Sequence, residues 1–204
     1  ISEQFRALRT NLSFYLKNEN EKVILLTSSM SGEGKSFTAI NLGNILALAG
    51  KRVLLMEMDL RKPGLAIKLG ISNVTGFSNY TISEKIKIKD IVQPLTINKN
   101  MFFISSGPLP PNPAETIISE HTAPLIEELK KQFDYIILDA PPIGIIADAQ
   151  LLAAYADVTL YLVRQGETKK QQLKIVEELN KTGKMKNIGI VINDISGKYY
   201  GYGY

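Results

Sequence analysis

Residues 29–36 form a segment that could bind the phosphates of a nucleotide. They follow an apolar run, precede a helix-like stretch and match the pattern G-x-x-x-x-G-K-[ST], except for Ser29 at the first position. In such a loop Gly32 and Gly34 let backbone N–H groups turn towards phosphate oxygens, and the following helix N-terminus adds positive charge. Lys35 would reach the β- and γ-phosphates, and Ser36 would offer its hydroxyl to Mg²⁺. A glycine-containing turn with an exposed lysine is the plain alternative, and the order of strand, loop and helix disfavours it.

Three carboxylates follow predicted strands and could complete this site. Asp139 ends the apolar run Tyr135–Leu138, and Glu57 and Asp59 come at the end of an earlier run. Because ligands of open α/β sheets bind beyond the carboxyl ends of the strands, we expect these acids and Lys35 in one crevice. An acid at the end of a buried strand is the usual second anchor for Mg²⁺ beside such a loop. A turn-capping role for Asp139 and surface ion pairs for the other two are the structural alternatives.

The elements that must position these groups alternate between short apolar runs and longer amphipathic stretches. The strand-like runs are Val23–Thr27, Arg52–Met56, Met101–Ser105, Tyr135–Leu138, Val158–Val163 and Asn187–Ile192. Several are apolar throughout, as expected of strands buried on both faces of a parallel sheet. The helix-like stretches between them are Ser36–Ala49, Ala123–Phe133 and Lys169–Thr182, and residues 64–100 are expected as short helices and loops at the rim. The pattern predicts a single α/β domain of the P-loop NTPase type, with a mostly parallel central sheet flanked by helices.

The composition excludes several other kinds of site. The chain has 204 residues, 24 Lys and Arg against 20 Asp and Glu, no Cys and one His. Without cysteine there is no disulfide, thiol nucleophile or cysteine-based zinc site, and a single histidine excludes two-histidine metal motifs. A net charge of +4 with both signs interspersed is too weak to indicate a nucleic acid partner. No run approaches the ~18 apolar residues of a membrane helix and no signal-peptide pattern is present, so we expect a cytoplasmic protein.

The combination of motifs resembles the bacterial protein-tyrosine kinases, often called BY-kinases. The segments 31–36, Glu57–Pro63 and Leu138–Pro142 are similar to the Walker A, A′ and B motifs of that family. The segment Gly107–Pro113, an N-terminal E-x-x-R-x-x-R pattern and a tyrosine-rich C-terminus also match, so the resemblance spans essentially the whole chain. The chain is similar to the cytoplasmic kinase of Gram-positive capsule or exopolysaccharide systems.

This resemblance implies a tyrosine kinase that uses ATP and Mg²⁺. The catalytic residues it implies are Lys35, Glu57, Asp59 and Asp139, and the Mg²⁺ ligands it implies are Ser36, Asp59 and Asp139. The nucleotide contacts it implies are Ser31, Gly32, Glu33, Gly34, Lys35, Ser36, Phe37 and Asn193, although a turn-forming role suits Asn193 equally well. In the family the first acid of the A′ motif acts on the substrate hydroxyl. This chain has Glu57 where the family usually has aspartate, so the carboxylate extends one methylene further.

The C-terminal end of the chain is unusually rich in tyrosine. Four of the nine tyrosines lie in its last six residues, at Tyr199, Tyr200, Tyr202 and Tyr204. Composition alone fits a sticky tail or a partner-binding segment as well as a set of phosphoacceptors. Beside a site that resembles a tyrosine kinase, we expect phosphoacceptors. We therefore expect a kinase domain over residues 1–194 and a flexible tail over residues 195–204.

Residues 1–20 are expected to form an N-terminal helix that takes part in oligomerisation. Glu3, Arg6 and Arg9 share one helical face, and their spacing alone favours a solvated face with an internal Glu–Arg pair. The resemblance implies instead that they join subunits in a ring, where each tail meets a neighbouring active site. It also implies a transmembrane adaptor, whose cytoplasmic tail recruits the kinase to the inner face of the cell membrane, and a cognate protein-tyrosine phosphatase.

Two other functions fit part of the sequence. An ATP-hydrolysing switch of the partition type would carry a lysine five residues before Lys35, where this chain has Met30. A non-catalytic adaptor that offers its tyrosines to another kinase would not need the lysine and acids described above. We therefore predict a kinase that autophosphorylates its tail, in trans between subunits, and thereby regulates capsular or exopolysaccharide synthesis.

Overall fold

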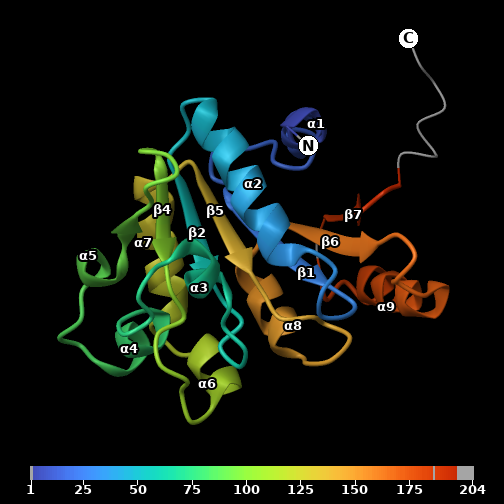
Figure 1. The fold of residues 1–204 in the computed structure, drawn as a ribbon. Helices are drawn as coiled ribbons and strands as arrows, with labels where there is room; N and C mark the ends of the chain where they lie inside the picture. Colours follow the sequence, from blue (N-terminus) through green and yellow to red (C-terminus); the bar gives the residue numbers. More distant parts are fainter. Residues whose placement is uncertain (1, 186, 197–204) are drawn as a thin grey trace.

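A computed structural model describes residues 2–185 and 187–196, and a sheet of seven strands runs through its centre (Figure 1). The strands are β1 (Val23–Ser28), β2 (Val53–Glu57), β3 (Gln93–Pro94), β4 (Met101–Ile104), β5 (Tyr135–Asp139), β6 (Val158–Arg164) and β7 (Ile188–Asn193). They lie in the order β3–β4–β2–β5–β1–β6–β7. All neighbours are parallel except β3 and β4, so the mostly parallel sheet predicted from the sequence is confirmed.

Helices cover both faces of this sheet. One face carries α1 (Ser2–Leu12) and α2 (Lys35–Leu48), and the other carries α7 (Thr122–Gln132), α8 (Asp148–Leu152) and α9 (Lys170–Lys181). The rim is formed by α3 (Leu65–Leu69), α4 (Phe77–Ile82), α5 (Ile88–Ile91) and α6 (Pro113–Ile117), and the 3₁₀ helix η1 (Ala153–Tyr155) follows α8. Within residues 2–185 and 187–196, no helix has the length and apolar character needed to cross a bilayer.

The central strands are apolar throughout because both of their faces are buried. In β1, Val23 and Leu25 pack into the core beneath α7, α8 and α9. The alternate residues Ile24 and Leu26 pack against α1 and α2, and all four side chains are fully buried. Each such side chain stabilises the fold by about 1.5–3 kcal/mol relative to exposure. Two-sided burial explains why the strands showed no alternation between apolar and polar residues.

The N-terminal helix is shorter than predicted, because α1 ends at Leu12 rather than near residue 20. The amide of Ser13 donates to the carbonyl of Thr10 at 3.2 Å, which tightens the last turn and stops the helix. Further along, the Glu21 carboxylate accepts hydrogen bonds from the backbone N–H groups of Lys17 and Asn18, at 2.7 and 3.1 Å. These contacts hold residues 17–21 as a loop that leads into β1.

The rim segments match the prediction in kind, and several short elements were missed. Residues 64–100 contain the short helices α3, α4 and α5, as expected, but also the two-residue strand β3. A strand of two residues has no periodicity that a sequence could reveal. The helices α6 and α8, of five residues each, and the three-residue helix η1 were also missed because they are so short.

The carboxyl ends of the parallel strands gather the predicted chemical groups at one edge. The loop of residues 29–34 follows β1, while Glu57 ends β2 and Asp139 ends β5. Glu57 and Asp139 are direct neighbours in the register of the β2–β5 pair, and Asp139 also pairs with Leu26 of β1. The crevice expected from the sequence therefore lies where β1, β5 and β2 end.

Candidate active site

The loop between β1 and α2 has the backbone conformation that phosphate binding needs. Gly32 and Gly34 have φ angles of 85° and 99°, in the left-handed region where glycine is favoured. A side chain at position 34 would also collide with Asn193, whose Nδ2 lies 2.1 Å from the place a Cβ would occupy. At the start of the loop, the Ser29 hydroxyl lies 2.8 Å from the Tyr161 hydroxyl in β6, so the serine that replaces glycine is held by the sheet.

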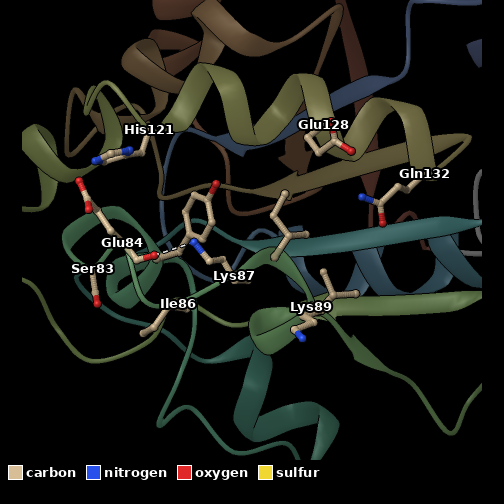
Figure 2. A pocket seen from close by; sticks show the side chains of 11 residues that line it. Ser83, Glu84, Ile86, Lys87, Lys89, His121, Glu128 and Gln132 are labelled. Atoms are coloured by element: carbon tan, nitrogen blue, oxygen red, sulfur yellow. Dashed lines mark hydrogen bonds between the residues drawn. The ribbon is translucent and has the colours of Figure 1, made fainter.

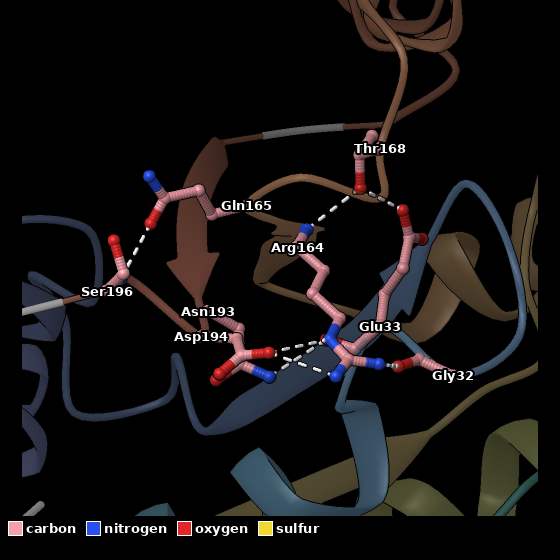
Figure 3. A network of polar contacts seen from close by, with 8 residues as sticks. All are labelled: Gly32, Glu33, Arg164, Gln165, Thr168, Asn193, Asp194 and Ser196. Carbon is pink, nitrogen blue, oxygen red and sulfur yellow. Dashed lines mark hydrogen bonds and ion pairs between the residues drawn. The ribbon is translucent and has the colours of Figure 1, made fainter.

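Side chains at or just after the ends of β6 and β7 hold this loop in place, as Figure 3 shows. Asn193 Nδ2 donates to the carbonyl of Glu33 at 3.0 Å. The buried Glu33 carboxylate accepts a hydrogen bond from the Met30 amide at 2.7 Å and another from the Thr168 hydroxyl. Asn193 and Glu33 were predicted to contact the nucleotide, which stays a prediction, and their side chains also hold the loop in shape.

Arg164, at the end of β6, extends this network to the end of β7. Its guanidinium donates to the Gly32 carbonyl at 3.3 Å and pairs with the Asp194 carboxylate at 2.9 Å (Figure 3). Beyond Asp194, the Ser196 amide donates to the Gln165 side chain at 2.8 Å. Sequence reasoning missed Arg164 and Asp194, although Arg164 directly follows one apolar run and Asp194 comes two residues after another, at the ligand-binding edge, which was the available signal.

Lys35 and Asp139 are buried with opposite charges at the mouth of the crevice. The Lys35 ammonium donates to the Ser28 hydroxyl at 3.0 Å. Burial lowers the pKa of Lys35, while the charges of Asp139, Asp59 and Glu33 act in the opposite direction. Burial raises the pKa of Asp139 to about 6, against the opposing effects of the Ser36 hydroxyl and the Lys35 charge. The lysine and two of the predicted acids therefore act on one another in a single crevice.

The oxygen atoms in this crevice suit a Mg²⁺ ion bound together with phosphates. Asp139 Oδ1 is buried and has no hydrogen-bond partner among the described residues, which is unusual for a carboxylate. No group of three or more His, Cys, Asp and Glu side chains that could hold a metal occurs in the described parts of the chain. Two carboxylates and a hydroxyl nevertheless fit Mg²⁺, because this ion keeps several waters and is often completed by substrate phosphates. Asp139, Asp59 and Ser36 are the residues that would hold it.

Comparisons with known proteins agree with this geometry. A family model described as an AAA domain matches residues 21–186. The tyrosine-protein kinase YwqD of Bacillus subtilis is 37% identical over 204 residues, which cover 100% of this chain and 85% of that protein. This chain belongs to the bacterial tyrosine-protein kinases. It is therefore a nucleotide-binding protein-tyrosine kinase with a P-loop fold.

Two solved structures show how closely the kinase follows the family fold. The chimerical protein CapA2B2 superposes with a TM-score of 0.88 at 32% identity, covering 96% of this chain and 85% of that one. The kinase domain of Escherichia coli tyrosine kinase ETK gives the same TM-score at 25% identity, covering 100% of this chain and 80% of that one.

The segment Glu57–Pro63 carries the other two predicted acids of the kinase. Asp59 is half-buried, burial raises its pKa, and its Oδ1 accepts a hydrogen bond from the Lys62 amide at 3.0 Å. Glu57 is 1% exposed, and its carboxylate accepts hydrogen bonds from the backbone at the start of α3. Its action on a substrate hydroxyl stays a prediction. Arg61 of this segment forms a two-point ion pair with the buried Asp148 of α8, at 2.7 and 3.1 Å, and Asp148 was not foreseen.

A hollow beside the loop has room for the rest of a nucleotide. Its volume is about 560 Å³, and it lies between α1, the start of α2 and the end of β7. Phe37 and Asn193, both predicted nucleotide contacts, line it together with Phe5 and Ile192. Phe37 packs edge-to-face against Phe5, with ring centroids 6.0 Å apart. The mixture of aromatic and amide groups suits a purine base.

A separate hollow of about 920 Å³ lies away from this site, between the α4–α5 segment and α7 (Figure 2). It is lined by both charge signs, including Lys87, Lys89, Glu84 and Glu128. The Lys87 ammonium already donates to the Glu84 carbonyl at 2.8 Å. None of the predicted site residues lines this hollow.

The predicted oligomer-forming residues lie on an exposed face of α1. Arg6 pairs with Glu3 at 2.9 Å, and their side chains are 57% and 80% exposed. An exposed pair of this kind contributes little to the stability of a single chain. The predicted phosphoacceptors Tyr199, Tyr200, Tyr202 and Tyr204 lie outside the described residues.

The raised pKa of Asp139 predicts how stability depends on pH in the nucleotide-free kinase. The folded state binds this proton more tightly than the unfolded chain does, so the free energy of unfolding falls as pH rises from about 4 to about 6. Asp139→Asn removes the buried charge and should raise that free energy by about 1–3 kcal/mol above pH 7, with no gain below about pH 4. Urea denaturation at both pH values measures this, with the exposed Glu167→Gln as control. A variant less stable than wild type at both pH values contradicts it.

Proposed function

We propose that this kinase transfers phosphate from Mg²⁺–ATP to its own C-terminal tyrosines, mainly between subunits. One observation carries the proposal: a buried lysine and a buried carboxylate lie beside a phosphate-binding loop, and one oxygen of that carboxylate has no hydrogen-bond partner within the described parts of the chain. The same chain ends in four closely spaced tyrosines. A chain that carries both a tyrosine kinase site and four clustered tyrosines is suited to autophosphorylation.

The roles of the residues follow from their positions. The backbone of residues 31–34 would cradle the phosphates, Lys35 would contact the β- and γ-phosphates, and Phe37 and Asn193 would flank the base. Ser36, Asp59 and Asp139 would hold Mg²⁺, which, when bound, offsets the negative charge of the phosphates. Fixing these groups before the substrate arrives is the main source of catalysis in phosphoryl transfer.

The reaction itself is an in-line displacement. The phenolic oxygen of tyrosine forms a bond to the γ-phosphorus while the bond from that phosphorus to the β–γ bridging oxygen breaks, and ADP leaves. The phenolic proton passes to a carboxylate or to water. Because the transition state is loose, the proton can leave late, so a carboxylate of ordinary basicity is sufficient.

The position of the last described residues favours the tail as a substrate. Residues 195 and 196 follow β7 at the ligand-binding edge, and Asp194 is tied to Arg164, which also contacts the phosphate loop. The tail therefore starts beside the active-site edge of its own subunit. We propose a catalytic domain over residues 1–194 and an acceptor tail over residues 195–204.

We further propose that the kinase assembles into a ring and is recruited to the membrane. On α1, Glu3 and Arg6 are exposed and Arg9 is partly exposed, so a neighbouring subunit could contact all three, which suits transfer in trans. The partners in this proposal are the cytoplasmic tail of a transmembrane adaptor and a cognate tyrosine phosphatase. The pathway is capsular or exopolysaccharide synthesis, in line with the family resemblance.

Mixing two full-length variants, neither of which can label itself, tests transfer between subunits. One variant carries Lys35→Met with an intact tail, and the other keeps Lys35 but has phenylalanine at all four tail tyrosines. Neither should label itself with γ-labelled ATP, whereas the mixture should label the tail of the Lys35→Met chain, as mapped by mass spectrometry. We expect Lys35→Met alone to lose at least about 100-fold in rate, because it removes a charge aimed at the transferred phosphate.

The exposed Lys51→Met is the matched control and should keep wild-type labelling. A wild type that labels itself while the mixture stays unlabelled indicates transfer within one chain. Release of ADP without any labelled protein indicates the ATP-hydrolysing switch instead.

The role of α1 is tested by the size of the assembly. Arg6→Ala combined with Arg9→Ala should convert the nucleotide-bound oligomer to monomers in light scattering, since two charged contacts per interface are lost. The control is Lys131→Ala with Lys181→Ala, which removes two exposed charges elsewhere. A wild type that is monomeric with nucleotide and an intact tail contradicts the ring.

A further inference from the structure

Glu57 makes hydrogen bonds that the expected proton acceptor would not need. Its Oε1 accepts from the backbone N–H groups of Leu65 and Ala66, the latter at 3.3 Å, and its Oε2 lies 3.4 Å from the Ser106 amide. The side chain is 1% exposed. Its carboxylate is thus directed into the protein, towards α3 and the segment that follows β4.

The amides that Glu57 binds have no other source of acceptors within α3. The first N–H groups of a helix lack intrahelical partners, and a polar residue just before the helix usually supplies them. Here that residue is Gly64, which has no side chain, and α3 is only five residues long. Leu65 and Ala66 are buried, so their amides cannot turn to water. Glu57 therefore supplies the cap from a neighbouring strand.

This contact also explains why the chain has glutamate where the family usually has aspartate. The carboxylate must cross from the end of β2 to the start of α3. Aspartate is one methylene shorter and would leave the two buried amides without an acceptor, which is costly for a folded protein. The additional length thus serves the contact with α3.

The position of α3 matters to the active site because it carries Lys68. The charge of Lys68 lowers the pKa of both Asp139 and Lys35, so this exposed lysine lies close enough to act on the crevice. Ser106 belongs to the loop after β4, which leaves the sheet at the same edge as the end of β2 because the two strands are parallel. Through α3 and Ser106, Glu57 joins two rim segments to the end of β2.

We propose that Glu57 is a positioning residue that anchors α3 and the Ser106 loop, and that it does not accept the proton of the substrate tyrosine. The proposal rests on the tyrosine kinase activity assigned to the chain. It leaves Asp59, whose charge acts on Lys35, as the carboxylate of this segment that serves the reaction.

Two variants of Glu57 give opposite results under the two roles. Glu57→Gln keeps an oxygen that can accept from both α3 amides and loses only the long contact with the Ser106 amide, at 3.4 Å, whereas Glu57→Asp keeps the charge and loses the reach. We expect Glu57→Gln to keep kcat for a peptide of residues 197–204 within about threefold, and to melt like wild type. We expect Glu57→Asp to lower kcat/KM about 10-fold or more and the melting temperature by about 4 °C or more.

The melting temperatures are measured without nucleotide, and kinetics well below them, so that unfolding does not enter the rates. The exposed Glu19→Gln and Glu19→Asp are matched controls and should change neither quantity. A loss of about 10²-fold or more in kcat for Glu57→Gln, with a milder loss for Glu57→Asp, overturns the proposal, because removing a general base has that effect.

Failure of the proposed function gives a different result. If wild type phosphorylates neither the peptide nor its own tail, the autokinase proposal fails while the melting temperatures still decide the anchoring role. In that case, a Glu57→Asp variant that melts like wild type overturns the anchor, and one that melts well below Glu57→Gln supports it.

Discussion

The burial of opposite charges at one edge of a parallel sheet is the constraint on which the rest of the structure depends. Burial raises the pKa of Asp139 and lowers that of Lys35, so each group is costly to charge there by itself. Their mutual attraction, the Ser28 hydroxyl and the loop between β1 and α2 offset this cost. Such an arrangement requires β1 and β5 to be neighbours with their carboxyl ends together, which the sheet order provides.

Side chains from the strands on either flank of β1 and β5 support this charged site. On one side, Asn193 and Arg164 hold the phosphate loop from the ends of β7 and β6, and the same network includes Asp194 at the start of the tail. On the other side, Glu57 and the Arg61–Asp148 pair hold the acidic segment to α3 and α8. The catalytic groups therefore depend on contacts between segments far apart in the chain.

Much of the fold and the core of the site could be predicted because they depend on local patterns. Apolar runs reveal strands buried on both faces, and parallel strands bring Asp139 and Lys35 to one edge whatever the loops do. The direction of the Glu57 side chain could not be predicted, because it depends on α3, a five-residue helix without periodicity. The contact of Thr168 with Glu33 links residues 135 positions apart, which no local pattern encodes. The end of α1 at Leu12 was missed because it is set by individual turn hydrogen bonds.

The claim that Asp139 and Lys35 form a Mg²⁺–nucleotide site is tested most directly by the affinity for ADP with and without Mg²⁺. Isothermal titration should show that Mg²⁺ tightens ADP binding to the wild type by about tenfold or more, equal to about 1.4 kcal/mol. Asp139→Asn should bind ADP equally well with and without the ion, because it lacks the carboxylate whose Oδ1 has no hydrogen-bond partner among residues 2–185 and 187–196. A wild type indifferent to Mg²⁺, or an Asp139→Asn variant that keeps the full gain, would contradict the account.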